Sequence, residues 1–547
     1  MLSRLVLTVG VLSAPALARA GEIAWVRAGD PARQTCGAAP GGWNQPAFDD
    51  RAWDEVEPPP DGGAGGNPDG GTGCAGTRYQ RWRFDAGAEL QKLATLTLRI
   101  RYSHGFAAYL NGVEIARRRL DPGAGAAALA TDYHGPEAER VILPFRAGLL
   151  RPSGNVLAIE VHPRTAGREA LVEAELSGAD GPRLVRGPYL QQLGERGATV
   201  VFDTDLPTVG AVRWGASEEY GFADAEPTAR THHVLKLRGL APGEAYHYRV
   251  TARGAPSPLA TNGNLPQASD AVDAGDARFH TAPGAGRPLR FVVYGDVRSG
   301  HDIHAALDRA LLDEDPDLVL VTGDLVDRGS DEGDWEKFFE VGAPLLRQLA
   351  IFPAVGNHEY ARLGRGLGAY QSFFPTEKGG ETYYSFDLAG VHFAALDSNQ
   401  YRSPQQLAWL DRDLGEAQRR GARALFVYAH EAPYATGLHG DNPVAIHDYV
   451  PVLERHHVTI FFGGHDHHYE RGRAGALDYV ITGGGGAELR PQKCGVAGKR
   501  PCPPRVLALY NEHHYVMVEV MPSFVRVCPK RPDQTPLEAC TTLPLKN

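Results

Sequence analysis

The 547-residue sequence has only six cysteines, and no two of them form a C-x-x-C pair, which argues against a zinc ribbon. No apolar stretch after residue 20 reaches the ~20 residues that a membrane span needs. The formal net charge is −10, so nothing in the composition favours binding to nucleic acid or to an anionic membrane. The glycine run Gly483–Gly486 lacks the Walker spacing and the following lysine of a P-loop. We interpret it as a tight loop that closes the floor of a site.

The first twenty residues are typical of a secretory signal. Arg4 supplies a positive charge, Leu5–Leu17 is apolar, and Ala18-Arg19-Ala20 offers the small residues of an A-x-A cleavage site. We therefore expect a secreted or periplasmic protein, in which an even number of cysteines indicates disulfides. Among the pairings that six cysteines allow, we expect the three between sequence neighbours, Cys36–Cys74, Cys494–Cys502 and Cys528–Cys540.

The remaining chain predicts two β-sandwiches followed by an α/β domain. Short apolar or alternating segments, such as Asn155–His162, predict strands in the first sandwich, and Asn111-Gly112 is a hairpin signal. In the α/β domain, Ser403-Pro404 is a predicted helix start, as N-cap and first helical residue. The expected parts are a signal peptide at 1–20, a sandwich at 21–180, a second sandwich at 184–283, the α/β domain at 288–527 and a disulfide-pinned tail at 528–547.

Five short apolar segments of the α/β domain are each followed by a residue that can bind a metal. In open α/β sheets the ligand crevice lies at the carboxyl ends of the strands, so these side chains should converge. His465 and His467 are two residues apart and point the same way in an extended loop. Six oxygen and nitrogen donors fit two divalent metals better than one. The segments are Phe291–Tyr294 before Asp296, Leu318–Val321 before Asp324, Ile351–Val355 before Asn357, Leu425–Tyr428 before His430, and Val458–Phe462 before His465 and His467.

These blocks, in this order, resemble the calcineurin-like superfamily of dinuclear metallophosphoesterases. The ending His465-x-His467-x-Tyr469-Glu470-Arg471 resembles purple acid phosphatases in particular. The resemblance implies a β-sandwich flanked by helices and two divalent ions, Fe, Mn or Zn. It also implies a phosphatase that hydrolyses small phosphate monoesters by attack of a hydroxide held at the metals. Two alternatives remain: a phosphodiesterase or nucleotide pyrophosphatase on the same site, and a non-enzymatic surface-binding protein with a weakened metal site.

The resemblance also implies a role for each site residue. Asp324 bridges the metals, Asn357, His430 and His465 bind the second metal, and Asp296 and His467 bind the first. His358 faces the substrate, as a hydrogen-bond donor or a proton donor. His439, in the loop after His430, is a candidate phosphate contact or acid, against the alternative of an exposed loop histidine. Glu359 either orients a neighbour or is a surface charge.

The sequence departs from the family at two positions of the first metal site. Many relatives have a histidine ligand where this chain has Arg298, and purple acid phosphatases have a tyrosine where it has Asp327. Candidates for the missing third ligand are Asp327, His301 and His304, although His304 could equally be a core residue. Arg298 cannot bind metal but could clamp a phosphate, or pair with a surface acid such as Asp302. Without the tyrosine we expect no tyrosinate-to-iron colour.

Two further resemblances concern the β-sandwiches. Phe106–Gly112 and Gly154–His162 resemble galactose-binding-like domains, which implies either contact with a glycan or surface or a structural spacer, and we favour the spacer. Leu240–Val250 resembles the fibronectin type III-like domain that precedes the catalytic domain of large purple acid phosphatases.

Overall fold

The computed structural model describes residues 22–56, 74, 76–88, 90, 93–132, 134, 138–168, 170–254, 271–360, 366–376, 382–495 and 501–545. The predicted signal peptide lies outside these residues. The chain divides into two compact units, Met1–Gly181 and Pro182–Asn547, and each is described by itself. Among the described helices, none is long and apolar enough to cross a bilayer.

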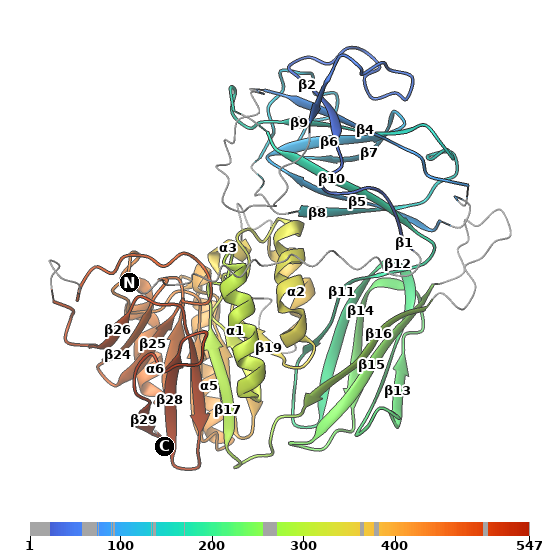
Figure 1. Ribbon diagram of the computed structural model, residues 1–547. Coiled ribbons are helices and arrows are strands. Elements are labelled where there is room, and N and C mark those ends of the chain that lie inside the picture. Colours follow the sequence, from blue (N-terminus) through green and yellow to red (C-terminus); the bar gives the residue numbers. More distant parts are fainter. Residues whose placement is uncertain are drawn as a thin grey trace, which may run out of the picture. The chain divides into compact units, whose positions relative to one another are not determined.

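The first unit is a β-sandwich of two antiparallel sheets (Figure 1). One sheet has the order β1-β10-β5-β8 and the other β3-β2-β4-β9-β6-β7. The predicted strand Asn155–His162 is β9, and all of its residues are buried. Asn111 and Gly112 both have positive φ, as a two-residue hairpin turn requires, and they connect β6 to β7. The strands are β1 (Glu22–Val26), β2 (Ala32–Cys36), β3 (Asp54–Val56), β4 (Arg78–Phe84), β5 (Thr95–Tyr102), β6 (Gly105–Leu110), β7 (Val113–Arg118), β8 (Ala138–Pro144), β9 (Asn155–His162) and β10 (Val172–Ala179).

The second unit begins with another β-sandwich, built around one long strand. β12 pairs with β11 and β14 through its first half and with β13 and β15 through its second half. Apolar side chains from both halves, such as Phe202 and Val212, lie in one core with Tyr248 and Val250. The strands are β11 (Leu184–Gln191), β12 (Gly197–Gly215), β13 (Phe222–Ala225), β14 (Arg230–Arg238), β15 (Ala245–Gly254) and β16 (Ala271–His280).

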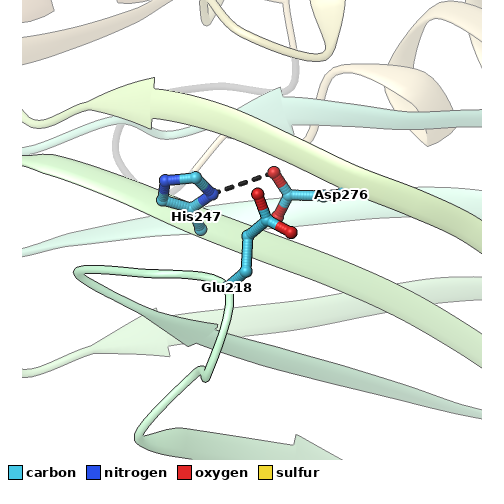
Figure 2. A group of neighbouring side chains, drawn as sticks. All are labelled: Glu218, His247 and Asp276. Carbon is cyan, nitrogen blue, oxygen red and sulfur yellow. Dashed lines mark hydrogen bonds and ion pairs between the residues drawn. The ribbon is translucent and has the colours of Figure 1, made fainter.

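A group of polar side chains lies on this sandwich, where Glu218, His247 and Asp276 bring potential ligand atoms within 4.8 Å of one another (Figure 2). Asp276 already accepts hydrogen bonds from His247 Nδ1 at 2.9 Å and from the Tyr220 hydroxyl at 3.0 Å. The guanidinium of Arg278 lies 4.0 Å from Glu218. Each of the three side chains therefore already has a polar or charged partner within the protein.

The rest of the second unit is an α/β domain with two facing sheets. The first sheet has the order β19-β18-β17-β27-β28-β29 and the second β20-β21-β22-β23-β25-β24-β26. The strands are β17 (Leu289–Tyr294), β18 (Leu318–Val321), β19 (Ile351–Pro353), β20 (Tyr384–Leu388), β21 (Val391–Ala395), β22 (Ala424–Tyr428), β23 (Ile460–Gly463), β24 (Tyr469–Ala474), β25 (Leu477–Thr482), β26 (Val506–Tyr510), β27 (Tyr515–Val520), β28 (Phe524–Lys530) and β29 (Thr541–Pro544). The helices are α1 (His301–Glu314), α2 (Glu332–Leu346), α3 (Asn357–Tyr360), α4 (Leu367–Phe373), the 3-10 helix η3 (Ser398–Gln400), α5 (Pro404–Arg419), the π-helix η4 (Ala445–Tyr449) and α6 (Val450–Arg455).

Alternation along the strands places the helices outside the sandwich. In β17, Phe291 and Val293 belong to the core between the two sheets, whereas Val292 and Tyr294 belong to the core under α1 and α2. α1 and α2 run side by side over this outer face (Figure 1). Ser403 caps α5 as predicted, because its hydroxyl accepts a hydrogen bond from the Gln406 amide. The predicted fold class, two β-sandwiches followed by an α/β domain of sheets flanked by helices, is confirmed.

The second sandwich and the α/β domain share contacts along α2 and α4. The buried guanidinium of Arg186 bonds to Asp203 at 2.5 Å within the sandwich and to Glu332 of α2 at 2.6 Å. The Tyr248 hydroxyl donates to the carbonyl of Arg347, just after α2. One hydrophobic cluster runs from the core of the sandwich into the core between the two sheets. The two parts are therefore joined by apolar packing as well as by ion pairs.

The C-terminal segment is more regular than expected. The boundary expected between residues 527 and 528 falls inside β28, and β29 pairs with β28 at the edge of the first sheet. The Cys528–Cys540 disulfide holds the connection between these two strands. Thr541–Pro544 is too short and polar for its sequence alone to show that it completes a sheet. The Cys36–Cys74 and Cys494–Cys502 disulfides are also present, so all three predicted pairings are confirmed.

A buried histidine joins the second sheet to α5 and makes stability depend on pH. His392 of β21 is 1% exposed, and its nitrogens lie 2.8 Å from Asp387 and 2.9 Å from Asp413. Burial lowers the pKa of His392, but hydrogen bonds to the two carboxylates outweigh burial and raise this pKa above 6.5. Because the folded-state pKa is the higher one, the stabilisation is complete below pH ~6.5 and is lost as pH rises through the folded-state value.

We expect His392→Gln to lower the free energy of unfolding by about 2 kcal/mol in mildly acidic solution, the value of hydrogen bonds to charged groups. The difference from wild type should shrink as pH rises, because wild-type His392 then loses its proton. Urea unfolding of both proteins at several pH values between about 5.5 and 9 measures this. A difference that is constant across the range would contradict the prediction.

Candidate metal site

Parallel strand pairing brings the predicted ligands of the first sheet together. Tyr294 at the end of β17 is paired with Val321 at the end of β18, so the loops carrying Asp296 and Asp324 leave the sheet side by side. The Asp296 amide donates to the Gly323 carbonyl at 3.0 Å. Asp296, Asp324 and His430 are all buried and offer ligand atoms within 4.8 Å of one another. Carboxylates that follow strands of the first sheet thus lie beside a histidine that follows a strand of the second, as expected where the carboxyl ends of strands meet.

The backbone is left-handed at four positions in these loops. Asp296 has a φ of 60°, Arg298 39°, Asp324 54° and His465 69°. Such a conformation costs a non-glycine residue of order 1 kcal/mol or more, and it persists only where surrounding contacts impose it. It turns each chain sharply at the end of its strand, and three of the four residues are predicted metal ligands.

Backbone carbonyls fix which nitrogen of each histidine faces the site. His430 Nδ1 lies 3.0 Å from the Thr322 carbonyl, and His467 Nδ1 lies 2.7 Å from the Glu488 carbonyl. Since a carbonyl only accepts, both Nδ1 atoms carry protons, and in the neutral imidazole each Nε2 atom presents its lone pair to the site. Metal-binding histidines are oriented in this way in proteins. His467 Nε2, the nitrogen without a proton, lies 3.5 Å from Asp296 Oδ1.

Three atoms with lone pairs crowd around His430 Nε2. Asn357 Oδ1 is 2.9 Å away, His465 Nδ1 3.0 Å and Asp324 Oδ1 3.3 Å. Atoms of this kind repel one another unless a cation lies among them. The donor set, imidazole nitrogens with carboxylate and amide oxygens, fits Fe, Mn or Zn. In the chain without metal, a proton supplies the missing charge.

The charges of these groups follow from the same crowding. Burial lowers the pKa of His430, but Asp324 and Asp296 outweigh burial and raise it to about 10. Burial together with His430 lowers the pKa of His465 to about 2. Burial also lowers the pKa of His467, to about 4. The neutral imidazoles of His465 and His467 therefore keep the lone pairs that a metal requires.

Glu359 is the structural centre of the Asp324 loop and not a surface charge. Its carboxylate is fully buried and accepts four backbone N–H groups: Gly356 at 2.7 Å, Leu325 at 2.7 Å, Asp324 at 3.0 Å and Val326 at 3.3 Å. One side chain thus ties the loop after β18 to the loop after β19. This position confirms that Glu359 orients its neighbours, the first of the two predicted roles.

Two further histidines lie beside the cluster in defined orientations. His358 Nδ1 lies 2.5 Å from the Asp327 carbonyl, so its Nε2 is the nitrogen free to meet a ligand. His439 stacks on His465 with ring centroids 3.7 Å apart, and its Nδ1 lies 3.1 Å from Asp466. Asp466, between the two histidines of the final motif, therefore positions His439. Sequence reasoning assigned Asp466 no role, and its place in that motif was the available signal.

The two residues that depart from the family pattern pair with each other. Arg298 Nε and Nη2 lie 3.0 and 2.5 Å from Asp327 Oδ1. The contact occupies Asp327, and the predicted alternative partner of Arg298, Asp302, does not take part in it. His304, another candidate ligand, stacks on Phe338 in the core, where burial lowers its pKa to about 3. At the two positions where the family pattern has a histidine or a tyrosine ligand, this chain thus has an ion pair.

The glycine run after β25 closes the site from below. The amides of Gly485 and Ala487 donate to the carbonyls of Gly295 and Asp296 at 2.9 and 2.8 Å. A Cβ atom on Gly483 would lie 2.4 Å from the Asp466 carbonyl and 2.9 Å from Asp296 Oδ2. Only glycine allows the backbone to approach the carboxylate this closely, which agrees with a tight loop at the floor of the site.

Comparison with known proteins identifies this region. A family model described as calcineurin-like phosphoesterase matches residues 289–469. Residues 289–469 form a calcineurin-like phosphoesterase domain. The phosphoesterase domain contains every predicted metal ligand and the two histidines, His358 and His439, that we expect to face the substrate. The recognition of a metallophosphoesterase from its ordered blocks is therefore confirmed.

Relatives from plants extend the likeness beyond the phosphoesterase domain. Purple acid phosphatase 23 of Arabidopsis thaliana is 26% identical over 44% of this chain and 57% of its own length. Purple acid phosphatase 18 of the same plant is 32% identical over 35% of this chain and 47% of its own length. The chain thus spans about half the length of these relatives. The solved structure of purple acid phosphatase PPD1 from yellow lupin (Lupinus luteus) has the same fold, with a TM-score of 0.59 and 16% identity over 87% of this chain and 94% of that one.

Proposed function

We propose that this protein is an exported, metal-dependent phosphatase that hydrolyses small phosphate monoesters at a two-metal site. The observation that carries the proposal is the convergence of lone pairs from Asp324, Asn357, His430 and His465 around one point, with Asp296 and His467 beside it. When bound, two divalent ions supply an activated water and neutralise charge on the phosphoryl oxygens.

The side chains of this chain then have distinct tasks. Asp324, Asn357, His430 and His465 would hold one ion, and Asp296 and His467 would hold the other, with Asp324 shared between the two. His358 presents Nε2 to the phosphoryl group or the leaving oxygen, because its Nδ1 is occupied by the Asp327 carbonyl. His439 is held by Asp466 as a phosphate contact.

Metal analysis and a substrate pair test the proposal. The purified protein should contain about two metal ions per chain and should hydrolyse p-nitrophenyl phosphate faster than bis(p-nitrophenyl) phosphate. It should show no intense visible charge-transfer band, because Asp327 stands where purple acid phosphatases have tyrosine. A faster diester rate would favour the phosphodiesterase or pyrophosphatase alternative. Absence of both metal and turnover would favour a non-enzymatic binding protein.

Export is supported by the predicted signal and by the three disulfides, which persist in oxidising compartments. We also propose that the first unit is a spacer and not a glycan-binding module. Its Trp43 ring packs edge to face against the rings of Tyr79 and Tyr109, with centroids 4.8 and 5.7 Å apart. Rings that pack against one another in this way have less of their surface left to stack on a sugar.

Arg298 allows a sharper test of the substrate site. The contacts with Asp327 use Nε and Nη2 and leave Nη1 for a phosphate oxygen. We expect Arg298→Ala to raise KM about ten- to a hundredfold, the equivalent of ~1.5–3 kcal/mol for a hydrogen bond to a charged group. Removal of the arginine also leaves the Asp327 carboxylate unpaired, and it repels the substrate.

Asp327→Ala is the matched control, because it frees the guanidinium and should lower KM or leave it unchanged. Steady-state kinetics and metal content of both variants decide the matter. An unchanged KM in Arg298→Ala would remove Arg298 from the phosphate site, and loss of metal would mean that the pair supports the ligands instead.

A further inference from the structure

A short segment after the glycine floor holds the loop that carries His439. The Lys493 amide donates to the Thr436 carbonyl at 3.3 Å, and Lys493 Nζ donates to the Leu438 carbonyl at 2.5 Å. Arg490 Nη1 lies 3.3 Å from His439 Nε2. The Cys494–Cys502 disulfide follows directly and ties down the end of the segment. Two cationic side chains are therefore fixed beside His439.

These two cations differ from their neighbours in having no acidic partner. Within the described part of the chain, the guanidinium of Arg490 has a hydrogen-bond partner only in His439, and Lys493 Nζ has one only in a carbonyl. By contrast, Arg298 is paired with Asp327, and Arg505 is paired with Asp441 at 2.6 Å. A guanidinium and an ammonium that lack counter-charges at the edge of a site are suited to bind an anion from solution.

The position of Arg490 relative to the metal ligands defines what it can reach. Its backbone N–H points at the His467 carbonyl, 3.4 Å away, and its guanidinium contacts the ring that stacks on His465. Only the His439 ring thus separates the guanidinium of Arg490 from the predicted ligand His465. Lys493 lies three residues later in the same segment and is exposed. Both cations therefore lie on the side of the predicted metal site that carries His439.

We propose that Arg490 and Lys493 form a second anion subsite, which selects substrates that carry a further phosphoryl group next to the one held at the metals. The ligand class is a diphosphate, such as a nucleoside diphosphate bound through its terminal phosphoryl group. The proposal rests on the proposed function, because the first phosphoryl group is placed by the metal site.

Binding of two non-hydrolysable anions to the metal-loaded full chain tests the subsite. Titration calorimetry with orthophosphate and with methylenediphosphonate compares one phosphoryl-like group with two, and metal content is measured again after each titration. Arg490→Gln should weaken methylenediphosphonate binding about tenfold and orthophosphate binding less than threefold, since loss of one charged hydrogen bond changes affinity on this scale. Lys493→Gln should act in the same direction but more weakly, because an ammonium on a flexible stem is less preorganised.

Arg455→Gln, on α6, is the control for an equal change of charge, and it should alter neither affinity. Equal weakening of both anions by Arg490→Gln would place Arg490 in the single-phosphate site, and no change in either would eliminate the subsite. Both results would overturn the proposal. Failure of the proposed function looks different, because the wild-type protein itself would then bind neither anion and hydrolyse no ester.

Discussion

Asp324→Ala is expected to lower kcat/KM by about 10³-fold or more, which corresponds to at least ~4 kcal/mol of transition-state stabilisation. The Asp324 carboxylate is 2% exposed, lies 3.3 Å from His430 Nε2 and accepts the His358 amide at 3.1 Å. Its loss removes the proposed bridge between two metals and one of the bonds that orient His358. Kinetics on a phosphate monoester, with metal content measured on the same samples, records both effects.

The matched control is Asp302→Ala, which removes a carboxylate from the exposed side of α1 and should leave activity and metal content close to wild type. Activity of Asp324→Ala within tenfold of wild type would remove Asp324 from the metal site. Thermal unfolding of the variant should remain cooperative, because the side chain lies in a loop at the end of a strand and is no part of the apolar core.

Glu359→Gln is expected to impair both stability and catalysis. A carboxylate has two accepting oxygens, and here each oxygen accepts two backbone N–H groups. A glutamine has one accepting oxygen, so its NH₂ group must face two N–H donors in a fully buried place. Two unsatisfied buried donors should lower the free energy of unfolding by about 3 kcal/mol.

Catalysis should fall in the same variant, because these N–H groups belong to the loops that carry Asp324 and Asn357. A 10- to 100-fold loss of metal affinity or kcat is typical when the support of a metal ligand is removed. Urea unfolding, metal titration and kinetics test the two effects separately. A variant as stable as wild type would show that the four hydrogen bonds are dispensable, and an unchanged metal affinity would show that the loops keep their geometry without them.

The sequence predicted those parts of the site that depend on local pattern. Each apolar run ends in a polar residue because a strand must leave the sheet there, so Asp296, Asp324 and His430 could be placed at one edge without coordinates. The Ser403 cap and the disulfides also follow from short-range patterns. The assignment of six ligands to two metals stays a prediction.

Other features depend on contacts between segments that are far apart in the chain. Arg298 pairs with a residue 29 positions away, and Glu359 bonds to amides more than 30 positions away as well as to nearby Gly356. The register of β17, β18 and β19 decides which loop residues meet. The partners of Glu359 are backbone amides, which nearly every residue type has, so the residue types do not identify them. For the same reason His439 and Arg490, which come from different loops, could not be paired from the sequence.

The continuous apolar core between the second sandwich and the phosphoesterase domain determines how this chain can be divided. Leu190 and Val250 of the sandwich belong to the same hydrophobic cluster as Phe291 and Phe393 of the facing sheets. A gene fragment that began after residue 283 would bring part of this cluster into water, and it would also leave Glu332 without Arg186. We therefore expect that the sandwich and the phosphoesterase domain do not fold independently and that they unfold in a single calorimetric transition. Recombination between genes would have to transfer the two parts together.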